Sequence, residues 1–270
     1  MGGRVSKKFL GCNASFDDAQ IVLFGVPYDA TATYRKGSRL APAAIRKESD
    51  GIETYSPYIN KDLEDIKVHD AGDIKIKGSD PAPMVYSVEA QTQKIIDAGK
   101  FPIMLGGEHL VTLGAVRAVA KKYPDLAIVH FDAHADLRDD WEGKRLNHST
   151  VMRRCFEITP HIYQYGIRSG TREEFDFIKK HILKELPKGR PVYFTVDLDV
   201  LDPSEMGGTG TPEAGGITFL DLLEQTKKVF GLNVVACDIN ELCPPYDTNG
   251  ASTALACKFL REVILLCQKT

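Results

Sequence analysis

The sequence lacks an excess of charge of either sign, because 34 Lys and Arg residues stand against 37 Asp and Glu residues and the formal net charge is −3. With 43% hydrophobic and 26% charged residues, the composition is that of an ordinary globular protein. A disordered tail, a collagen-like repeat or a strongly basic nucleic-acid-binding protein would each need a composition well outside these values. We therefore expect a folded protein that does not bind nucleic acid.

Signals for export or for a membrane are also missing. The N-terminus reads MGGRVSKK and is followed only by Phe9 and Leu10, whereas a signal peptide needs an apolar run, and no stretch is long enough for a membrane span. The six cysteines form no C-x-x-C pair, and Cys257 and Cys267 fall in an apolar helical pattern, which is typical of reduced, buried thiols. These absences predict a cytoplasmic protein without membrane contact.

No linker and no internal repeat divides the chain, so residues 1–270 are expected to form one domain, with residues 1–15 as a flexible N-terminal segment. Short runs rich in Val, Ile and Phe alternate with segments of helical apolar spacing, which is typical of a parallel sheet with crossover helices. The predicted strands are 21–26, 66–70, 101–105, 126–131, 161–166, 191–197 and 234–239. The predicted helices are 41–50, 84–98, 110–122, 149–158, 172–185, 218–230 and 252–267. The expected class is α/β, with roughly seven or more strands.

Potential metal ligands follow three of these strands, at the sheet edge where α/β proteins bind ligands. Strand 126–131 runs directly into Asp132, His134 and Asp136, whose spacing of two points their side chains to one face while the chain stays extended. Strand 191–197 ends in Asp197 and continues to Asp199, with Asp202 beyond. The sequence thus predicts a convergence of carboxylates and imidazole at this edge.

The third strand, 101–105, continues into Gly106-Gly107-Glu108-His109, where two glycines permit a sharp turn and a second imidazole follows. A single Asp after a strand usually makes a turn or caps a helix, and a lone His is more often structural than a ligand. The Gly-Gly turn also resembles a phosphate-binding loop, but the Lys-Ser/Thr of a P-loop is absent. The chemical argument therefore depends on the combination of the three strand ends.

Four aspartates and two histidines gathered at one site would repel one another and force protonation, unless about two divalent cations balanced the four negative charges. A set of Asp and His ligands without thiolate favours Mn²⁺, Fe²⁺ or Zn²⁺, and the majority of carboxylates favours Mn²⁺. Two such ions about 3.5–4 Å apart can activate a bridging water. The residues therefore predict metal-assisted hydrolysis and leave the substrate open.

At this point the sequence resembles the ureohydrolases, the arginase and agmatinase family, over almost its whole length. The resemblance is carried by the motifs Gly-Gly-Glu-His (106–109), Asp-Ala-His-Ala-Asp (132–136) and Thr-Val-Asp-Leu-Asp-Val-Leu-Asp-Pro (195–203). It implies a three-layer α/β/α fold around a mostly parallel sheet of about eight strands, and two Mn²⁺ ions per subunit. By resemblance, the first ion takes His109, Asp132, Asp136 and Asp197, and the second takes Asp132, His134, Asp197 and Asp199.

The chain is most similar to the agmatinase branch, through residues 25–37, 210–216 and 240–247. The resemblance implies that Glu241 accepts the substrate guanidinium, a role for which a carboxylate is well suited because the guanidinium is planar and has paired N–H donors. It also implies that His148 lies beside the metal pair and protonates the leaving amine. His130 is expected to pack beside the metal loop or to support a ligand.

The implied reaction is hydrolysis of agmatine to urea and putrescine, in which a bridging hydroxide attacks the guanidinium carbon and Asp132 bridges the ions. Arg138 occupies the place of an Asn that arginases use for the head group of arginine, which weakens an arginase assignment. Its charge would attract the carboxylate of guanidinobutyrate or guanidinopropionate, unless Asp139 or Asp140 holds it.

Guanidinobutyrase and guanidinopropionase therefore stay open as alternatives, with arginase and formiminoglutamase behind them. A dinuclear phosphoesterase and a non-catalytic metal-binding regulator are alternatives from other classes. The expected partner is a small cationic guanidino substrate, and the resemblance implies a homo-trimer or homo-hexamer.

Overall fold

A central sheet of seven strands, all paired in parallel, forms the middle of the computed structural model, which describes residues 8–268. The strand order is β4-β1-β5-β9-β8-β6-β7. Their bounds are β1 (Ile21–Gly25), β4 (Val68–Asp73), β5 (Phe101–Leu105), β6 (Ala127–Phe131), β7 (Ile162–Tyr165), β8 (Pro191–Asp197) and β9 (Asn233–Asn240). A separate antiparallel pair consists of β2 (Tyr55–Ser56) and β3 (Lys61–Asp62), which the sequence did not indicate.

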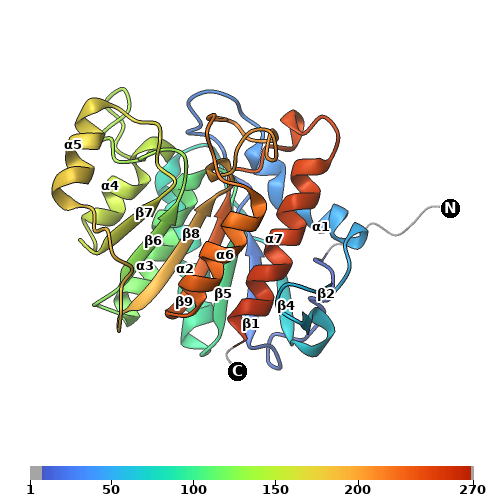
Figure 1. The fold of residues 1–270 in the computed structure, drawn as a ribbon. Helices are drawn as coiled ribbons and strands as arrows, with labels where there is room; N and C mark the ends of the chain where they lie inside the picture. The colour runs from blue at the N-terminus through green and yellow to red at the C-terminus, as the bar shows by residue number, and fades with distance from the viewer. Residues whose placement is uncertain (1–7, 269–270) are drawn as a thin grey trace.

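Helices cover both faces of the sheet (Figure 1). They are α1 (Ala41–Glu48), α2 (Pro81–Asp97), α3 (Thr112–Lys122), α4 (Val151–Phe156), α5 (Arg172–His181), α6 (Phe219–Phe230) and α7 (Ala251–Cys267). One core cluster joins the sheet to α1, α6 and α7, and a second joins it to α2, α3 and α4. The predicted three-layer α/β/α fold is confirmed, with seven strands in the main sheet where about eight were expected.

The hydrophobic runs of the strands explain why two layers of helices are needed. In β5, Ile103 and Leu105 enter the first core while Met104 enters the second. In β8, Phe194 belongs to the first core and Tyr193 to the second. Successive side chains of a strand point to opposite faces, so a strand that is apolar at every position must be buried on both sides.

The register of the sheet aligns the strand ends that carry the candidate ligands. Leu105 pairs with Ile239, Ile239 with Val196, and Val196 with Phe131 across four neighbouring strands. The residue after each of these lies at the same edge, and for two of the strands those residues are Asp132 and Asp197. Residues 65 positions apart in the chain are therefore brought to one place by backbone pairing alone.

The turn after β5 approaches its neighbours so closely that only glycine fits. An ideal Cβ on Gly106 would lie 1.8 Å from Asn240 Oδ1, and one on Gly107 would lie 2.0 Å from the carbonyl oxygen of Tyr28. The Glu108 N–H donates a hydrogen bond of 2.8 Å to the same Tyr28 oxygen. The two glycines thus let the chain turn and direct His109 into the edge of the sheet.

Part of the N-terminal segment differs from the expectation of flexibility. Phe9 and Cys12 are buried, and the Phe9 N–H donates to Asp70 Oδ2 over 2.9 Å. Arg46 donates two hydrogen bonds, of 2.8 and 2.9 Å, to the same Asp70 carboxylate. Residues 8–15 are therefore packed against the sheet, and residues 1–7 lie outside the described part of the chain.

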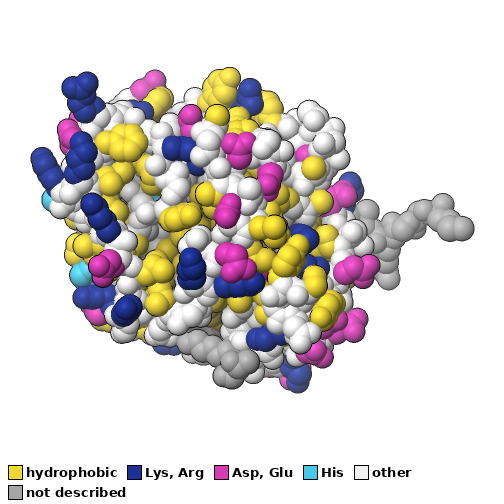
Figure 2. All heavy atoms as spheres, in the orientation of Figure 1, with side chains coloured by type: hydrophobic (Ala, Val, Ile, Leu, Met, Phe, Trp, Pro, Cys, Tyr) yellow, Lys and Arg dark blue, Asp and Glu magenta, His cyan; other side chains and the backbone are white. Residues whose placement is uncertain are grey.

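Surface and thiol features agree with the composition. All six cysteines are free thiols, and five of them are buried. Between residues 8 and 268, no helix is both long enough and apolar enough to cross a membrane. Figure 2 shows side chains of both charge signs spread over the face drawn.

Replacing Gly107 with alanine should lower the thermal stability of the protein. The new Cβ would meet the Tyr28 carbonyl, and overpacking of this kind costs about 1–3 kcal/mol of the free energy of unfolding. Thermal unfolding followed by circular dichroism measures the effect. Gly51→Ala is the matched control, because a Cβ at Gly51 meets open space. Equal melting temperatures for the two variants would contradict the packing argument.

Candidate metal centre and substrate pocket

His109 directs one ring nitrogen at three carboxylates. Its Nδ1 lies 3.1 Å from Asp132 Oδ2, 3.5 Å from Asp136 Oδ2 and 3.5 Å from Asp197 Oδ2. Its Nε2 lies 2.8 Å from the hydroxyl of Thr195 on β8, and the side chain is fully buried. One nitrogen is thus held by the protein, while the other points to where a cation would complete the group.

His109 lies near Oδ2 of Asp132, and His134 lies near the other carboxylate oxygen, Oδ1. Its Nδ1 lies 2.9 Å from Asp199 Oδ2 and 3.6 Å from Asp132 Oδ1. Two overlapping groups, His109 with His130 and Asp132, and Asp132 with His134 and Asp199, each place ligand atoms within 4.8 Å of one another. Asp132 is common to both groups, so the geometry is suited to two cations that share it.

Backbone hydrogen bonds fix the directions of these carboxylates. Asp197 Oδ1 accepts the Asp199 N–H at 2.8 Å, and Asp199 Oδ1 accepts the Ala133 N–H at 3.0 Å. Asp136 has a positive φ of 53°, and its carbonyl oxygen accepts the N–H groups of residues 152 and 153. The extended spacing therefore ends at Asp136, where the left-handed backbone turns the carboxylate towards the group.

The electrostatics of the group favour the binding of cations. Burial, together with the charges of Asp199 and Asp132, raises the pKa of Asp197 well above its usual value. Burial and the charge of Asp132 also raise the pKa of Asp199. Buried carboxylates of this kind are stabilised in the ionised form by bound cations. The donor set contains imidazole nitrogens and carboxylates without thiolate, which fits Mn²⁺, Fe²⁺ or Zn²⁺.

His130 makes a hydrogen bond to the carboxylate of Asp132. The Gln164 side-chain N–H₂ group donates to the carbonyl oxygen of Ala135 and to His130 Nδ1, at 2.7 and 3.0 Å. Since Nδ1 accepts, the proton of a neutral ring lies on Nε2, which is 2.8 Å from Asp132 Oδ2. This arrangement agrees with the expectation that His130 supports a ligand.

Glu241 lies at the carboxyl end of β9, beside the same group. Its Oε1 accepts the His109 N–H at 2.8 Å and lies 3.6 Å from His148 Nδ1. Its φ of 66° is unusual for a residue with a side chain, and the Glu241 N–H donates to the carbonyl oxygen of Gly107 at 2.9 Å. Strained backbone is concentrated at functional sites, because the surrounding structure must hold it there.

His148 is the first residue of a short helical turn, 148–150, and Thr33 contacts its Nε2 atom. The Thr33 N–H donates to Nε2 at 3.1 Å, and the Thr33 hydroxyl lies 2.9 Å from the same atom. Burial lowers the pKa of His148, but Glu241, Asp136 and Glu108 outweigh it and raise the pKa to about 9. The Thr33 hydroxyl can donate or accept, so it can contact Nε2 in either state, whereas the Thr33 N–H can donate only when Nε2 carries no proton.

Glu108 has a structural role that the sequence did not reveal. It is fully buried, and it accepts the Thr31 N–H at 2.9 Å and a hydrogen bond from the Thr31 hydroxyl. That hydroxyl accepts the His148 N–H at 3.1 Å, and Asn147 Nδ2 donates to the Thr31 carbonyl. Burial raises the pKa of Glu108 to about 7. Nothing in the Gly-Gly-Glu-His run distinguishes this buried glutamate from an exposed one.

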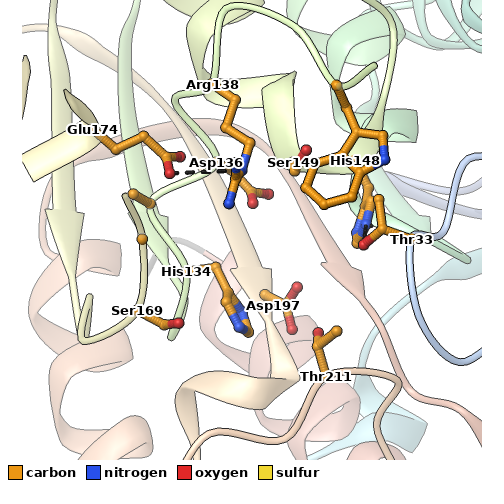
Figure 3. A pocket seen from close by; sticks show the side chains of 13 residues that line it. Thr33, His134, Asp136, Arg138, His148, Ser149, Ser169, Glu174, Asp197 and Thr211 are labelled. Carbon is orange, nitrogen blue, oxygen red and sulfur yellow. Dashed lines mark hydrogen bonds and ion pairs between the residues drawn. The ribbon is translucent and has the colours of Figure 1, made fainter. Parts of the chain in front are cut away.

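Four of the predicted residues line a cavity of about 260 Å³, and His109, Asp132, Asp199 and Glu241 are not among its lining residues (Figure 3). His134, Asp136, Asp197 and His148 line it. Further lining residues, which sequence reasoning did not single out, are Thr33, Ala135, Trp141, Ser149, Ser169, Gly170, Glu174 and Thr211. Asp202 does not join the group, because its exposed carboxylate accepts the N–H groups of residues 204, 215 and 216 and shapes that loop.

Arg138 also lines the cavity, and neither Asp139 nor Asp140, the two partners that the sequence left open, holds it. Asp139 pairs with Arg154 at 2.6 Å, and Asp140 accepts a backbone N–H from residue 143. Arg138 lies instead against Glu174, with 3.8 Å between Nε and Oε2. Adjacent residues on a loop often point apart, and here tertiary packing brings the partner from α5.

Comparison with known proteins agrees with this geometry. The family model described as the Arginase family matches residues 19–266. An agmatinase of Bacillus anthracis is 47% identical and covers 96% of each chain, and a guanidinobutyrase of Pseudomonas aeruginosa is 32% identical over 93% of this chain and 87% of its own. The crystal structure of agmatine ureohydrolase of Thermoplasma volcanium superposes with a TM-score of 0.87, at 34% identity, over 96% of this chain and 94% of that one.

The chain is therefore similar in sequence and in fold to proteins of one family along nearly its whole length. The protein belongs to the arginase family and is an enzyme of the ureohydrolase class.

Proposed function

We propose that the protein is a dinuclear manganese enzyme that hydrolyses the guanidinium group of agmatine to give urea and putrescine. The observation that carries the proposal is the position of Glu241 and His148 beside a buried group of imidazole and carboxylate ligands. The similarity to agmatinases at up to 47% identity supports the choice of substrate. The regulator and phosphoesterase alternatives lose their support because the chain belongs to the arginase family.

The proposed metal ligands divide into two sets that share two bridging aspartates. One Mn²⁺ would be held by His109, Asp132, Asp136 and Asp197, and the other by Asp132, His134, Asp197 and Asp199. When bound, the ions would neutralise the carboxylates and supply a water of lowered pKa as the nucleophile. His130 and Thr195 would keep the ligand side chains in register, through the hydrogen bonds that they already make to Asp132 and His109.

Glu241 would bind the substrate guanidinium. The hydrogen bond from the His109 N–H fixes the plane of its carboxylate, and the left-handed backbone at Glu241 holds the side chain beside the cavity. A carboxylate can accept two parallel N–H bonds from a guanidinium, which orients the carbon for attack. This contact would place the reacting carbon next to His148.

His148 would protonate the departing amine. The carboxylates of Glu241, Asp136 and Glu108 raise the pKa of His148, which favours a protonated ring, and Nδ1 faces the Glu241 carboxylate that would hold the substrate. The Thr33 hydroxyl can pair with Nε2 whether or not this nitrogen carries a proton, whereas the Thr33 N–H donates only to an unprotonated Nε2. General acid catalysis of this kind contributes typically about 10²–10⁴-fold to the rate. The products would be urea and a primary diamine.

A guanidino acid is the second candidate substrate, because a cationic side chain, Arg138, lines the cavity. The similarity to a guanidinobutyrase is lower, at 32% identity, than the similarity to agmatinases. The cytoplasmic location and the trimeric or hexameric assembly stay predictions.

Substrate assignment is tested by urea release from the manganese-loaded enzyme. Agmatine, 4-guanidinobutyrate, 3-guanidinopropionate and arginine are compared at equal concentrations. We expect the highest kcat/KM for agmatine. Higher kcat/KM for guanidinobutyrate would overturn the substrate and keep the reaction, whereas no urea from any of the four compounds would overturn the proposed function.

Replacing Asp197 with asparagine should remove a bridging ligand and with it the metal site. Bound manganese, measured by elemental analysis after dialysis, should fall below two ions per subunit, and urea release should drop by more than about 100-fold. Asp202→Asn is the control, because this carboxylate is exposed and lies outside the group. Turnover near that of the control would contradict the ligand assignment.

Replacing His148 with asparagine should separate proton transfer from metal binding. We expect kcat to fall by about 10²-fold or more while two manganese ions remain bound. His161→Asn serves as the control, since His161 pairs with Asp125, a residue that does not line the cavity. If the His148 variant retained its kcat, another group would have to protonate the amine.

A further inference from the structure

One wall of the cavity carries an ion pair that the proposed reaction does not use. Arg138 Nε lies 3.8 Å from Glu174 Oε2, and the guanidinium lies over the Trp141 ring with 4.9 Å to its centroid. Figure 3 shows the pair across the cavity from His148 and Thr33. Apart from the proposed ligands and His148, Arg138 and Glu174 are the charged side chains that line the described cavity.

The pair and His148 line the same cavity. A substrate whose guanidinium is bound by Glu241 beside His148 would meet the pair with its far end if it extends across this cavity. Agmatine ends in an ammonium, whereas guanidino acids end in a carboxylate. The two substrate classes therefore differ at the end that would meet Arg138 and Glu174.

The Glu174 side chain is buried and held by hydrogen bonds, whereas the Arg138 side chain is partly exposed. The Glu174 side chain is 4% exposed, and its oxygens accept the Leu137 N–H at 2.9 Å and the Thr171 N–H at 2.8 Å. The second of these bonds belongs to the capping box at the start of α5, so the carboxylate is fixed. The Arg138 side chain is 35% exposed, so it is the member that a ligand can touch.

The carboxylate behind Arg138 sets the effective charge that a substrate meets. An isolated guanidinium at this wall would repel an ammonium and attract a carboxylate. A carboxylate about 4 Å away offsets most of that field, and stacking on Trp141 restrains the guanidinium by a cation–π contact. The intact pair thus removes the penalty for a cationic end.

We propose that Glu174 is a specificity-determining residue, which makes the cavity accept an ammonium-ended guanidino substrate by neutralising Arg138 against the wall formed with Trp141. The inference rests on the proposed function and identifies the groups that choose between its two substrate classes. Arg138 is the residue that would favour a carboxylate if Glu174 did not oppose it.

The test compares kcat/KM for agmatine with kcat/KM for 4-guanidinobutyrate in three variants. Glu174→Gln keeps an acceptor oxygen but loses the charge, and the agmatine-to-guanidinobutyrate ratio should fall by about tenfold, mainly through KM. Arg138→Gln should raise the same ratio. Glu173→Gln is the matched control, since it removes the same charge from the exposed neighbouring position of α5 and should leave the ratio unchanged.

A merely structural role for Glu174 would lower both activities together and leave the ratio as it is, which would overturn the inference. If Glu174→Gln does not fold, because the α5 capping box is weakened, Arg138→Gln decides alone. An unchanged ratio in that variant would also overturn the inference.

Binding can be followed without turnover, because Trp141 is the single tryptophan of the chain. Titration of the metal-loaded His148→Asn variant, in which turnover is slow, should show the same shift of the affinity ratio, read from Trp141 fluorescence, when Glu174→Gln is added. If the wild-type enzyme released no urea, the proposed function would fail, while the binding ratio would still test the role of Glu174. Urea release with an unmoved ratio would overturn the inference alone.

Discussion

The mutual repulsion of buried carboxylates is the constraint on which the rest of this structure depends. Asp132, Asp197 and Asp199 are almost fully buried; burial and the charges of Asp199 and Asp132 raise the pKa of Asp197, and burial and the charge of Asp132 raise the pKa of Asp199. Among the hydrogen bonds and ion pairs of the described residues, no lysine or arginine contacts their carboxylate oxygens, and Arg168 donates only to the backbone carbonyl of Asp199. Their side-chain oxygens contact imidazoles, backbone N–H groups and the hydroxyl of Thr211. Bound cations would balance the remaining negative charge.

The surrounding framework holds these groups in place before any substrate arrives. Thr195 holds one nitrogen of His109, Gln164 sets the proton of His130, and Glu108 supports the turn of His148 through Thr31. Each of these contacts joins two segments that are far apart in the chain. Such preorganisation is what allows a site to stabilise developing charge without reorganising at the moment of reaction.

The floor and the wall of the cavity balance charge in different ways. At the floor, carboxylates gather with imidazoles and without lysine or arginine at their carboxylate oxygens, and this favours divalent metal. At the wall, Arg138 lies against Glu174, and this would remove the repulsion that an ammonium end meets. The first arrangement concerns the reaction and the second concerns the choice of substrate, so changes at the wall need not disturb the chemistry at the floor.

The sequence by itself determined the layers and most of the site. Apolar runs such as 101–105 and 191–197 predict buried parallel strands, because only strands covered on both faces are apolar at every position. The alternation of Asp132, His134 and Asp136 directly after a strand predicts the candidate metal centre, since parallel strands bring their carboxyl ends to one edge. These patterns involve residues that are close together in the chain, so they can be recognised without knowledge of the fold.

Only the tertiary structure decided the partners that come from distant segments. The two-residue strands β2 and β3 carry too few residues for a pattern, and the packing of Phe9 depends on a carboxylate 61 positions away. Likewise, Arg138 has acidic neighbours in sequence, yet it pairs with Glu174 of α5 on one wall of the cavity. Side-chain direction on a loop follows from what packs against it, and that information is absent until the sheet, α5 and the loops are assembled.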